Sequence, residues 1–304
     1  MPNLNTMDTT YGALFIGLIL SAILYGVALL QTFMYYRRHP EDSRIMKSMV
    51  FLLCALDTGH LILCTMGLYD YLISNFNNPD ALVRTTWTMN LQFSGTGLIG
   101  IIVQCFFARR VRIMSGNVIL TVIILILASV EFSLGILFTV NSFILGNNTK
   151  LAKLFWITNT GLGCAAAADI MIAAALCYYL NKSRTGSSRA DSLIAILIAY
   201  SVTTGLISSV IAVLCVILFA AMPNNLIGYA LFLIIGKCYV NSLLAALNCR
   251  DSLRERLDQR PNTLLRLTLT PVGALTSMAH ITEDPLSSDS TNTKYPYTDT
   301  LEDT

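Results

Sequence analysis

A few ionisable side chains lie inside long apolar stretches of this sequence. Asp57, His60, Asp169 and Lys237 each fall near the middle of such a stretch, and Glu131 lies closer to one end. A charge near the centre of a bilayer costs about 3 kcal/mol or more, so each group needs a counter-charge, a proton or a polar cavity. These residue types point to the binding of a small ligand or ion, or to proton transfer.

Helical spacing places several of these groups on shared faces. Asp57 and His60 are three residues apart, and Lys237 and Asn241 are four apart, with Asn248 two turns farther on. We expect both faces to point into a helix bundle. With Asp169 they would form one polar seam between the second, fifth and seventh apolar stretches.

The charges in this polar seam do not balance. Three carboxyls and one lysine leave an excess of negative charge, so at least one acid is expected to carry a proton, or His60 to be protonated. A structural alternative stays open: Asp57 and Lys237 would form an ion pair that locks two helices, with Asn241 and Asn248 as interhelical hydrogen-bond donors. Further candidates for the seam lie on the third apolar stretch, at Ser94, Thr96 and Gln104.

Composition and apolar runs predict the elements that carry these groups. Of 304 residues, 54% are hydrophobic and 12% are charged, against roughly 25% charged in soluble domains. Runs of this length cross a bilayer as helices, which satisfy their own backbone hydrogen bonds. The predicted spans are 12–34, 48–69, 88–108, 117–139, 155–180, 193–220 and 227–248.

The predicted fold is therefore all-α: a polytopic membrane protein with a seven-transmembrane-helix bundle at 12–249. An N-terminal segment, 1–11, would lie outside the cell. Residues 250–304 would form a cytosolic tail that is disordered beyond its first turns, because its acidic, Ser/Thr-rich end has little to bury.

The basic residues of the loops set the expected orientation. Ten follow the first, third and fifth stretches, and three lie in the opposite loops. By the positive-inside rule the N-terminus is extracellular and the C-terminus cytosolic, and we expect the plasma membrane. Asn147 begins a glycosylation triplet in a loop assigned to the outer face. Cys249 lies where palmitoylation is common.

Composition also limits the function classes. The net charge of +2 argues against a nucleic-acid partner. We find no metal-ligand cluster, phosphate loop or nucleophile motif, and therefore predict no enzyme activity, cofactor or metal. The expected partners are membrane lipid, a small-molecule ligand and a cytosolic protein that binds the tail.

Three motifs carry a family resemblance. They are Tyr35-Tyr36-Arg37, Asp57-x-x-His60 and Lys237-x-Tyr239-x-Asn241-Ser242-x-x-Ala245-x-Leu247-Asn248-x-Arg250. From about residue 12 to 256 the chain resembles a fungal seven-helix family, abundant in basidiomycetes, that is catalogued as a domain of unknown function. The resemblance implies a membrane location and a shared fold, and it transfers no activity.

Several functions compete for this architecture. A receptor-like sensor is favoured by the seven spans and the long tail, although rhodopsin-like signatures of G-protein coupling are missing. A proton- or cation-coupled transporter or channel would use the same intramembrane acids, and so would a terpene-cyclase-like membrane enzyme. A retinal protein would need a Schiff base on Lys237, but Leu233 stands where the microbial version has an aspartate.

Overall fold

The computed structural model describes the backbone of residues 12–76, 78, 84–147, 151, 154–182, 188–222 and 226–269. Side chains are described over the same ranges, except at 188–204 and 250–269. The chain divides into two units, Met1–Glu255 and Arg256–Thr304. The predicted extracellular segment 1–11 and residues 270–304 of the predicted tail lie outside the described residues.

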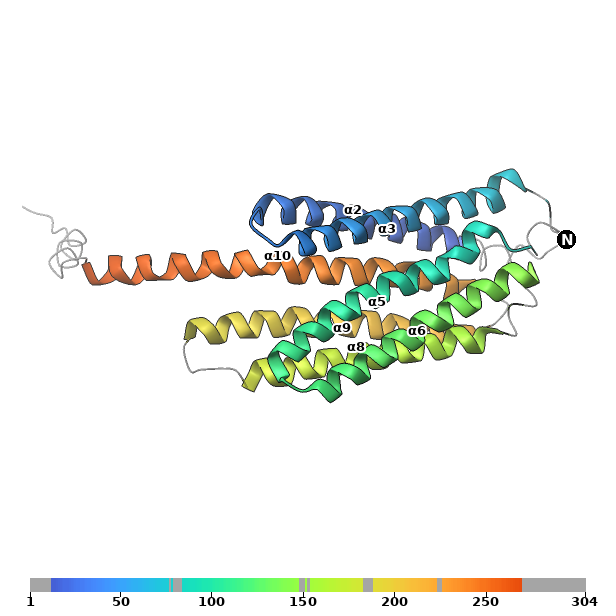
Figure 1. Ribbon diagram of the computed structural model, residues 1–304. Helices are drawn as coiled ribbons and strands as arrows, with labels where there is room; N and C mark the ends of the chain where they lie inside the picture. Colours follow the sequence, from blue (N-terminus) through green and yellow to red (C-terminus); the bar gives the residue numbers. More distant parts are fainter. Residues whose placement is uncertain are drawn as a thin grey trace, which may run out of the picture. The chain divides into compact units, whose positions relative to one another are not determined.

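The described part of the chain is helical, as predicted. It forms seven long α-helices and a π-helix (Figure 1). In chain order they are α2 (Ala13–Arg38), α3 (Arg44–Tyr69), η2 (Asp70–Ser74), α5 (Trp87–Ser115), α6 (Val118–Leu145), α8 (Phe155–Lys182), α9 (Ser188–Ala221) and α10 (Ile227–Leu269).

Six of these helices are long and apolar enough to cross a bilayer. They are α2, α3 continued through η2, α5, α6, α8 and the Ile227–Cys249 part of α10. The seventh predicted span falls on α9, of which Gly205–Ala221 is described as a shorter apolar helix. The structure is thus compatible with an integral, multi-pass membrane protein.

Several helices continue beyond the apolar runs that predicted them. The span predicted to end at residue 108 continues as α5 to Ser115, because basic residues such as Arg112 suit the carboxyl end of a helix. Gly116 then ends α5 with a φ of 65°, a left-handed conformation that favours glycine. Asn117 begins α6 by accepting hydrogen bonds from two backbone amides, those of Ile119 and Leu120.

The last helix also continues farther than the sequence predicted. Order was expected only for the first turns after residue 249, whereas α10 continues to Leu269. Residues 250–269 include six leucines and five arginines, which are good helix formers.

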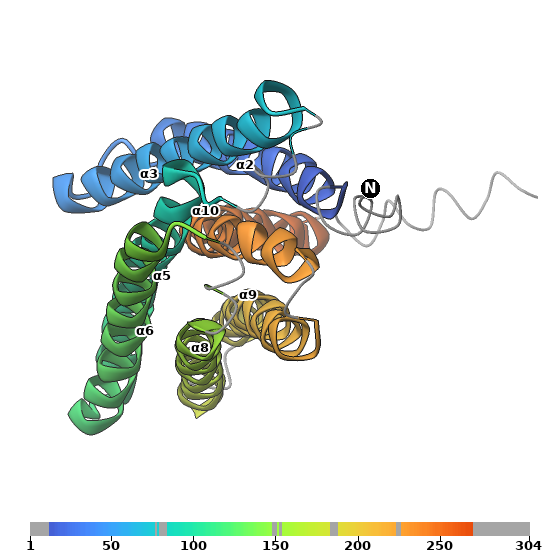
Figure 2. The same cartoon turned by 90° about the vertical axis from the view of Figure 1, so that its right-hand side faces the viewer.

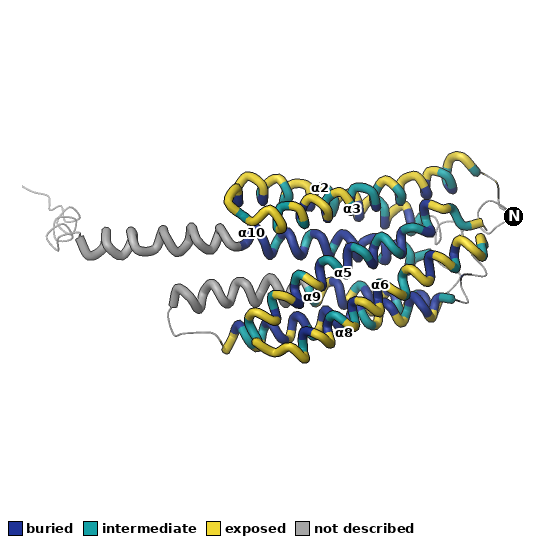
Figure 3. The backbone as a smooth tube through the Cα atoms, in the orientation of Figure 1, coloured by how far each residue is buried: buried dark blue, intermediate teal, exposed yellow. Residues whose placement is uncertain are grey.

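Within the first unit, α10 lies at the centre of the bundle. In Figure 2 it lies between α2 and α3 on one side and α8 and α9 on the other, with α5 alongside. In an 18-residue apolar window of α10, 78% of the residues are buried, against 22% in the corresponding windows of α2 and α6. Figure 3 shows this contrast. The other helices pack on their neighbours in chain order, α2 with α3, α3 with α5, α5 with α6, α6 with α8 and α8 with α9.

Candidate functional site

Asp57 of α3 and Lys237 of α10 form a buried ion pair. Lys237 Nζ donates to Asp57 Oδ1 at 2.6 Å and to the Asp57 backbone carbonyl at 2.7 Å. The two side chains are 1% and 0% exposed. The Tyr25 ring of α2 lies below the ammonium group, with its centroid 5.3 Å from Nζ. The charge of Lys237 is therefore compensated by Asp57.

His60 lies one turn from Asp57 and faces α5. Its Nε2 is 3.1 Å from Thr96 Oγ1, and its Nδ1 is 3.7 Å from Cys64 Sγ on the same helix. Gln92 Nε2 donates to the His60 backbone carbonyl at 3.4 Å. His60, Thr96 and Cys64 are all buried, so this group extends the ion pair along α3.

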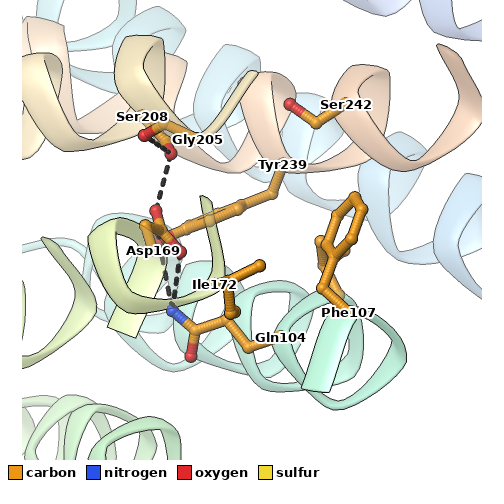
Figure 4. Close-up of a pocket in the computed structure, with 9 residues that line it drawn as sticks. Gln104, Phe107, Asp169, Ile172, Gly205, Ser208, Tyr239 and Ser242 are labelled. Carbon is orange, nitrogen blue, oxygen red and sulfur yellow. Dashed lines mark hydrogen bonds between the residues drawn. The ribbon is translucent and has the colours of Figure 1, made fainter. Parts of the chain in front are cut away.

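Asp169 of α8 lies in a second polar group, shown in Figure 4. Its Oδ2 accepts hydrogen bonds from Ser208 Oγ at 2.6 Å and from the Tyr239 hydroxyl at 3.0 Å. Its Oδ1 accepts from Gln104 Nε2 at 3.2 Å. The carboxylate is 5% exposed and borders a cavity of about 20 Å³ that also reaches Ser242. One carboxylate thus joins side chains of α5, α8, α9 and α10.

Glu131 of α6 adjoins the Asp169 group. Its side chain lies near those of Gln104, Asp169 and Tyr239. It is 8% exposed and borders a cavity of about 30 Å³ between α5, α6 and α8. Glu131 Oε2 and Thr158 Oγ1, both at this cavity, have no hydrogen-bond partner among the described residues.

The structure therefore contains two polar groups where the sequence predicted one seam. The first is the ion-pair group, Asp57, His60, Thr96 and Lys237; the second is the acid pair, Glu131 and Asp169, with Gln104, Ser208 and Tyr239 around it. Lys237 and Tyr239 are two residues apart, or about 200° around the helix, and so point to opposite sides of α10. Helix α10 thus divides the predicted seam, because a central helix has two inward faces.

Two asparagines of α10 contact α2 and not the acid pair. Asn241 Nδ2 donates to the Leu24 carbonyl at 3.0 Å, and Asn248 Nδ2 donates to the Gln31 carbonyl at 2.8 Å. These are hydrogen bonds between helices, as the structural alternative requires.

Sequence reasoning identified part of the second polar group. Gln104 was a candidate, whereas Ser94, named with it, donates only within its own helix, to Leu91. Ser208 and Thr158 were missed, because single hydroxyl residues are common in membrane helices. Tyr239 was noticed only as part of a motif, although a tyrosine inside an apolar run two residues from Lys237 is a usable signal.

The structure describes the surroundings of two modification candidates. Cys249 is 7% exposed, and a buried thiol is a poor acceptor for an acyl chain. Asn147 forms an isolated backbone bridge with Arg84, and the other two residues of its triplet lie outside the described residues. All eight cysteines are free, and the described residues contain no cluster able to hold a metal ion.

A comparison with protein families gives a match over part of the chain. The profile of a family of unknown function, DUF6534, matches residues 165–252, which run from α8 into α10. The matched segment includes Asp169, Ser208, Lys237 and Tyr239. No curated protein and no solved structure matches the chain. The chain is thus similar to a family without an assigned function, and the fungal origin expected from the sequence stays a prediction.

Proposed function

We propose that this chain is a seven-helix, receptor-like membrane sensor whose ligand is a proton or a small monovalent cation bound at the acid pair, Glu131 and Asp169. One observation supports this most directly. Lys237 is the only buried lysine or arginine among the described side chains, and it is paired with Asp57. Two buried carboxyls therefore share one polar group in which none of the described side chains is that of a lysine or arginine.

The cavities beside the acid pair favour a very small ligand. They measure about 20 Å³ at Asp169 and about 30 Å³ at Glu131, enough for a water molecule or an ion of similar size. Organic ligands need about 300 Å³ or more. This size also disfavours a cyclase-like enzyme at these acids, and we assign no catalytic role.

The contacts of Asp169 suggest how occupancy would act on the fold. Ser208 and Tyr239 donate to the carboxylate from α9 and α10, and Gln104 donates from α5. Adding or removing one positive charge changes the strength of all three hydrogen bonds together. Such a group couples an ion to the packing of four helices, as a sensor requires.

The membrane topology in this proposal is the one predicted from the sequence. Helix α9 completes seven spans, and the ten-to-three bias of basic loop residues places the N-terminus outside and the tail in the cytosol. The same orientation leaves Asn147 available for glycosylation at the plasma membrane.

A cation or proton carrier is the second candidate. It is favoured by the arrangement of Glu131 and Asp169, which border separate cavities and both lie near Gln104. If the protein carries Na⁺ or H⁺ into proteoliposomes, and Asp169→Asn abolishes this flux, the protein is a carrier and not a sensor. A retinal protein is disfavoured, since Lys237 Nζ already lies within 2.7 Å of two oxygens.

The sensor proposal predicts a stability that depends on Na⁺ and on pH. Raising the pH removes protons from the buried acids, leaves their charge uncompensated and should lower the melting temperature; Na⁺ should oppose that fall. Occupancy at 100 times the dissociation constant contributes about 2.7 kcal/mol, or roughly 5 °C or more. Thermal unfolding of the purified full-length protein, with Na⁺ exchanged for K⁺ at constant ionic strength, measures this.

Three variants make this experiment specific. Asp169→Asn and Glu131→Gln should remove most of the Na⁺ and pH dependence, whereas Glu41→Gln, an exposed acid outside the acid pair, should keep it. Equal dependence in all three variants would disprove the assignment of the site.

A further inference from the structure

A groove lies where the end of α3 meets the start of α5. It has a volume of about 580 Å³, large enough for an organic ligand. Its lining contains one acid, two aromatic residues, several hydroxyls and a thioether, and none of the nine described residues that line it is basic. These residues are Thr65, Met66, Tyr69, Asp70, Ser74, Thr85, Thr86, Trp87 and Thr88.

Asp70, the acid of the groove, lies where the helix changes type. At Asp70 the α-helical turns of α3 give way to the π-helix η2, and π-helical turns are frequent at functional sites. Asp70 Oδ1 accepts a hydrogen bond from Asn75 Nδ2 that is long, 3.3 Å. The carboxylate is partly exposed, so it can accept a further donor or face a positive charge in the groove.

Two aromatic rings stand exposed beside this carboxylate. Tyr69 is 54% exposed and Trp87 is 55% exposed. Tyr71, by contrast, is buried: its hydroxyl donates to the Arg84 carbonyl at 2.8 Å and accepts from the Thr86 amide at 3.2 Å. These two hydrogen bonds fix residues 84–86, the segment that precedes Trp87. The groove is therefore formed before any ligand binds.

We propose that this groove binds the ammonium group of an organic cation. A carboxylate supplies the counter-charge, and exposed tryptophan and tyrosine faces attract alkylated ammonium ions through cation–π interactions. Two sources share this chemistry: a free amine, and the choline headgroup of a neighbouring lipid. Tyrosine and tryptophan are typical of the headgroup level of a membrane. The proposal is independent of the acid pair.

Tryptophan fluorescence of the full-length protein tests this proposal directly. The chain has two tryptophans, so Trp156→Phe leaves Trp87 as the single reporter; Trp156 lies on α8 outside the groove. In detergent without choline groups, tetramethylammonium and choline should change the Trp87 emission with saturation. The neutral choline isostere 3,3-dimethylbutan-1-ol should produce no saturable change, since it lacks the charge. Equal responses to choline and to the isostere would overturn the proposal.

Variants in the Trp156→Phe background identify the groups that bind. Asp70→Asn should weaken tetramethylammonium binding by about tenfold or more, and Tyr69→Leu by about threefold or more. Glu41→Gln and Tyr178→Leu are the matched controls, because both residues are exposed and lie outside the groove. If Asp70→Asn and Tyr69→Leu bind like their controls, the groove is not the site.

Nanodiscs distinguish the two sources. If the cation is a lipid headgroup, phosphatidylcholine discs alone should give the emission of the tetramethylammonium-saturated protein, and Asp70→Asn should remove that effect. If it is a free amine, tetramethylammonium should act equally in phosphatidylcholine and phosphatidylglycerol discs. An emission that neither lipid nor amine changes overturns the proposal. The fluorescence results do not depend on the acid pair. They would stand whether or not Asp169→Asn loses the Na⁺ dependence of its stability.

Discussion

Replacing Lys237 with methionine is expected to lower the free energy of unfolding by about 3–5 kcal/mol. The substitution leaves Asp57 buried without its counter-charge, and the Asp57 carbonyl also loses the ammonium donor. Asp57 would then have to take up a proton, so the loss of stability should grow as the pH rises. Thermal unfolding of the purified protein between pH 5 and 9 measures the effect.

The double variant is the control for this prediction. Asp57→Leu with Lys237→Met removes both charges and should recover most of the lost stability, because a buried ion pair is worth little more than apolar residues of similar volume. The coupling energy follows from the thermodynamic cycle of wild type, two single variants and the double variant. Single variants as stable as the wild type would contradict the buried pair. If the pair is only a lock, the Na⁺ dependence should survive in the double variant.

The existence and position of the helices could be predicted from the sequence for a physical reason. Lipid imposes a minimum apolar length and forces helical hydrogen bonding, so one-dimensional patterns determine the spans. Helix ends were less predictable. Arg112 is too polar to belong to an apolar run, but a basic residue is favourable in the last turn of a helix. Helix α5 therefore continues beyond the apolar run from which it was predicted.

The partners of the buried polar groups could be predicted only in part. Asp57 and Lys237 carry opposite charges, and burial of either charge alone would be costly. Their pairing was among the alternatives that the sequence left open. No feature of the sequence indicates the order of the helices around α10. Asp169 was therefore assigned to the same seam as Asp57, although α10 lies between them and presents Lys237 to one and Tyr239 to the other.

The groove at Asp70 shows another limit of sequence reasoning. Asp70 lies just after a predicted span, where an acid at a loop start needs no explanation. Its surroundings depend on the π-helical turn and on Tyr71, which holds residues 84–86 against η2. These contacts join segments more than ten residues apart, and neither spacing nor composition indicates them.

A larger residue at Gly17 should separate α2 from α10. A Cβ atom added there would lie 2.9 Å from the Cα, Cβ and carbonyl oxygen of Ala230. Two of these atoms belong to the backbone and the third is attached directly to it, so none can move aside as the end of a flexible side chain would. Gly17→Ala should therefore cost about 1–3 kcal/mol of unfolding free energy, and Gly17→Leu more than about 3 kcal/mol. Thermal unfolding of both variants in detergent gives the comparison.

Gly26 provides the matched control on the same helix. It is exposed, and an added Cβ would meet nothing within 4 Å, so Gly26→Ala should be neutral or stabilising by up to about 1 kcal/mol through helix propensity. The contrast isolates the close approach of two backbones from the intrinsic effect of removing a glycine. Equal effects at Gly17 and Gly26 would mean that α2 does not pack on α10 at Ala230. Because Asn241 and Asn248 also bond α2 to α10, a displaced α2 would break those hydrogen bonds too, and the cost at Gly17 should exceed that of the steric contact alone.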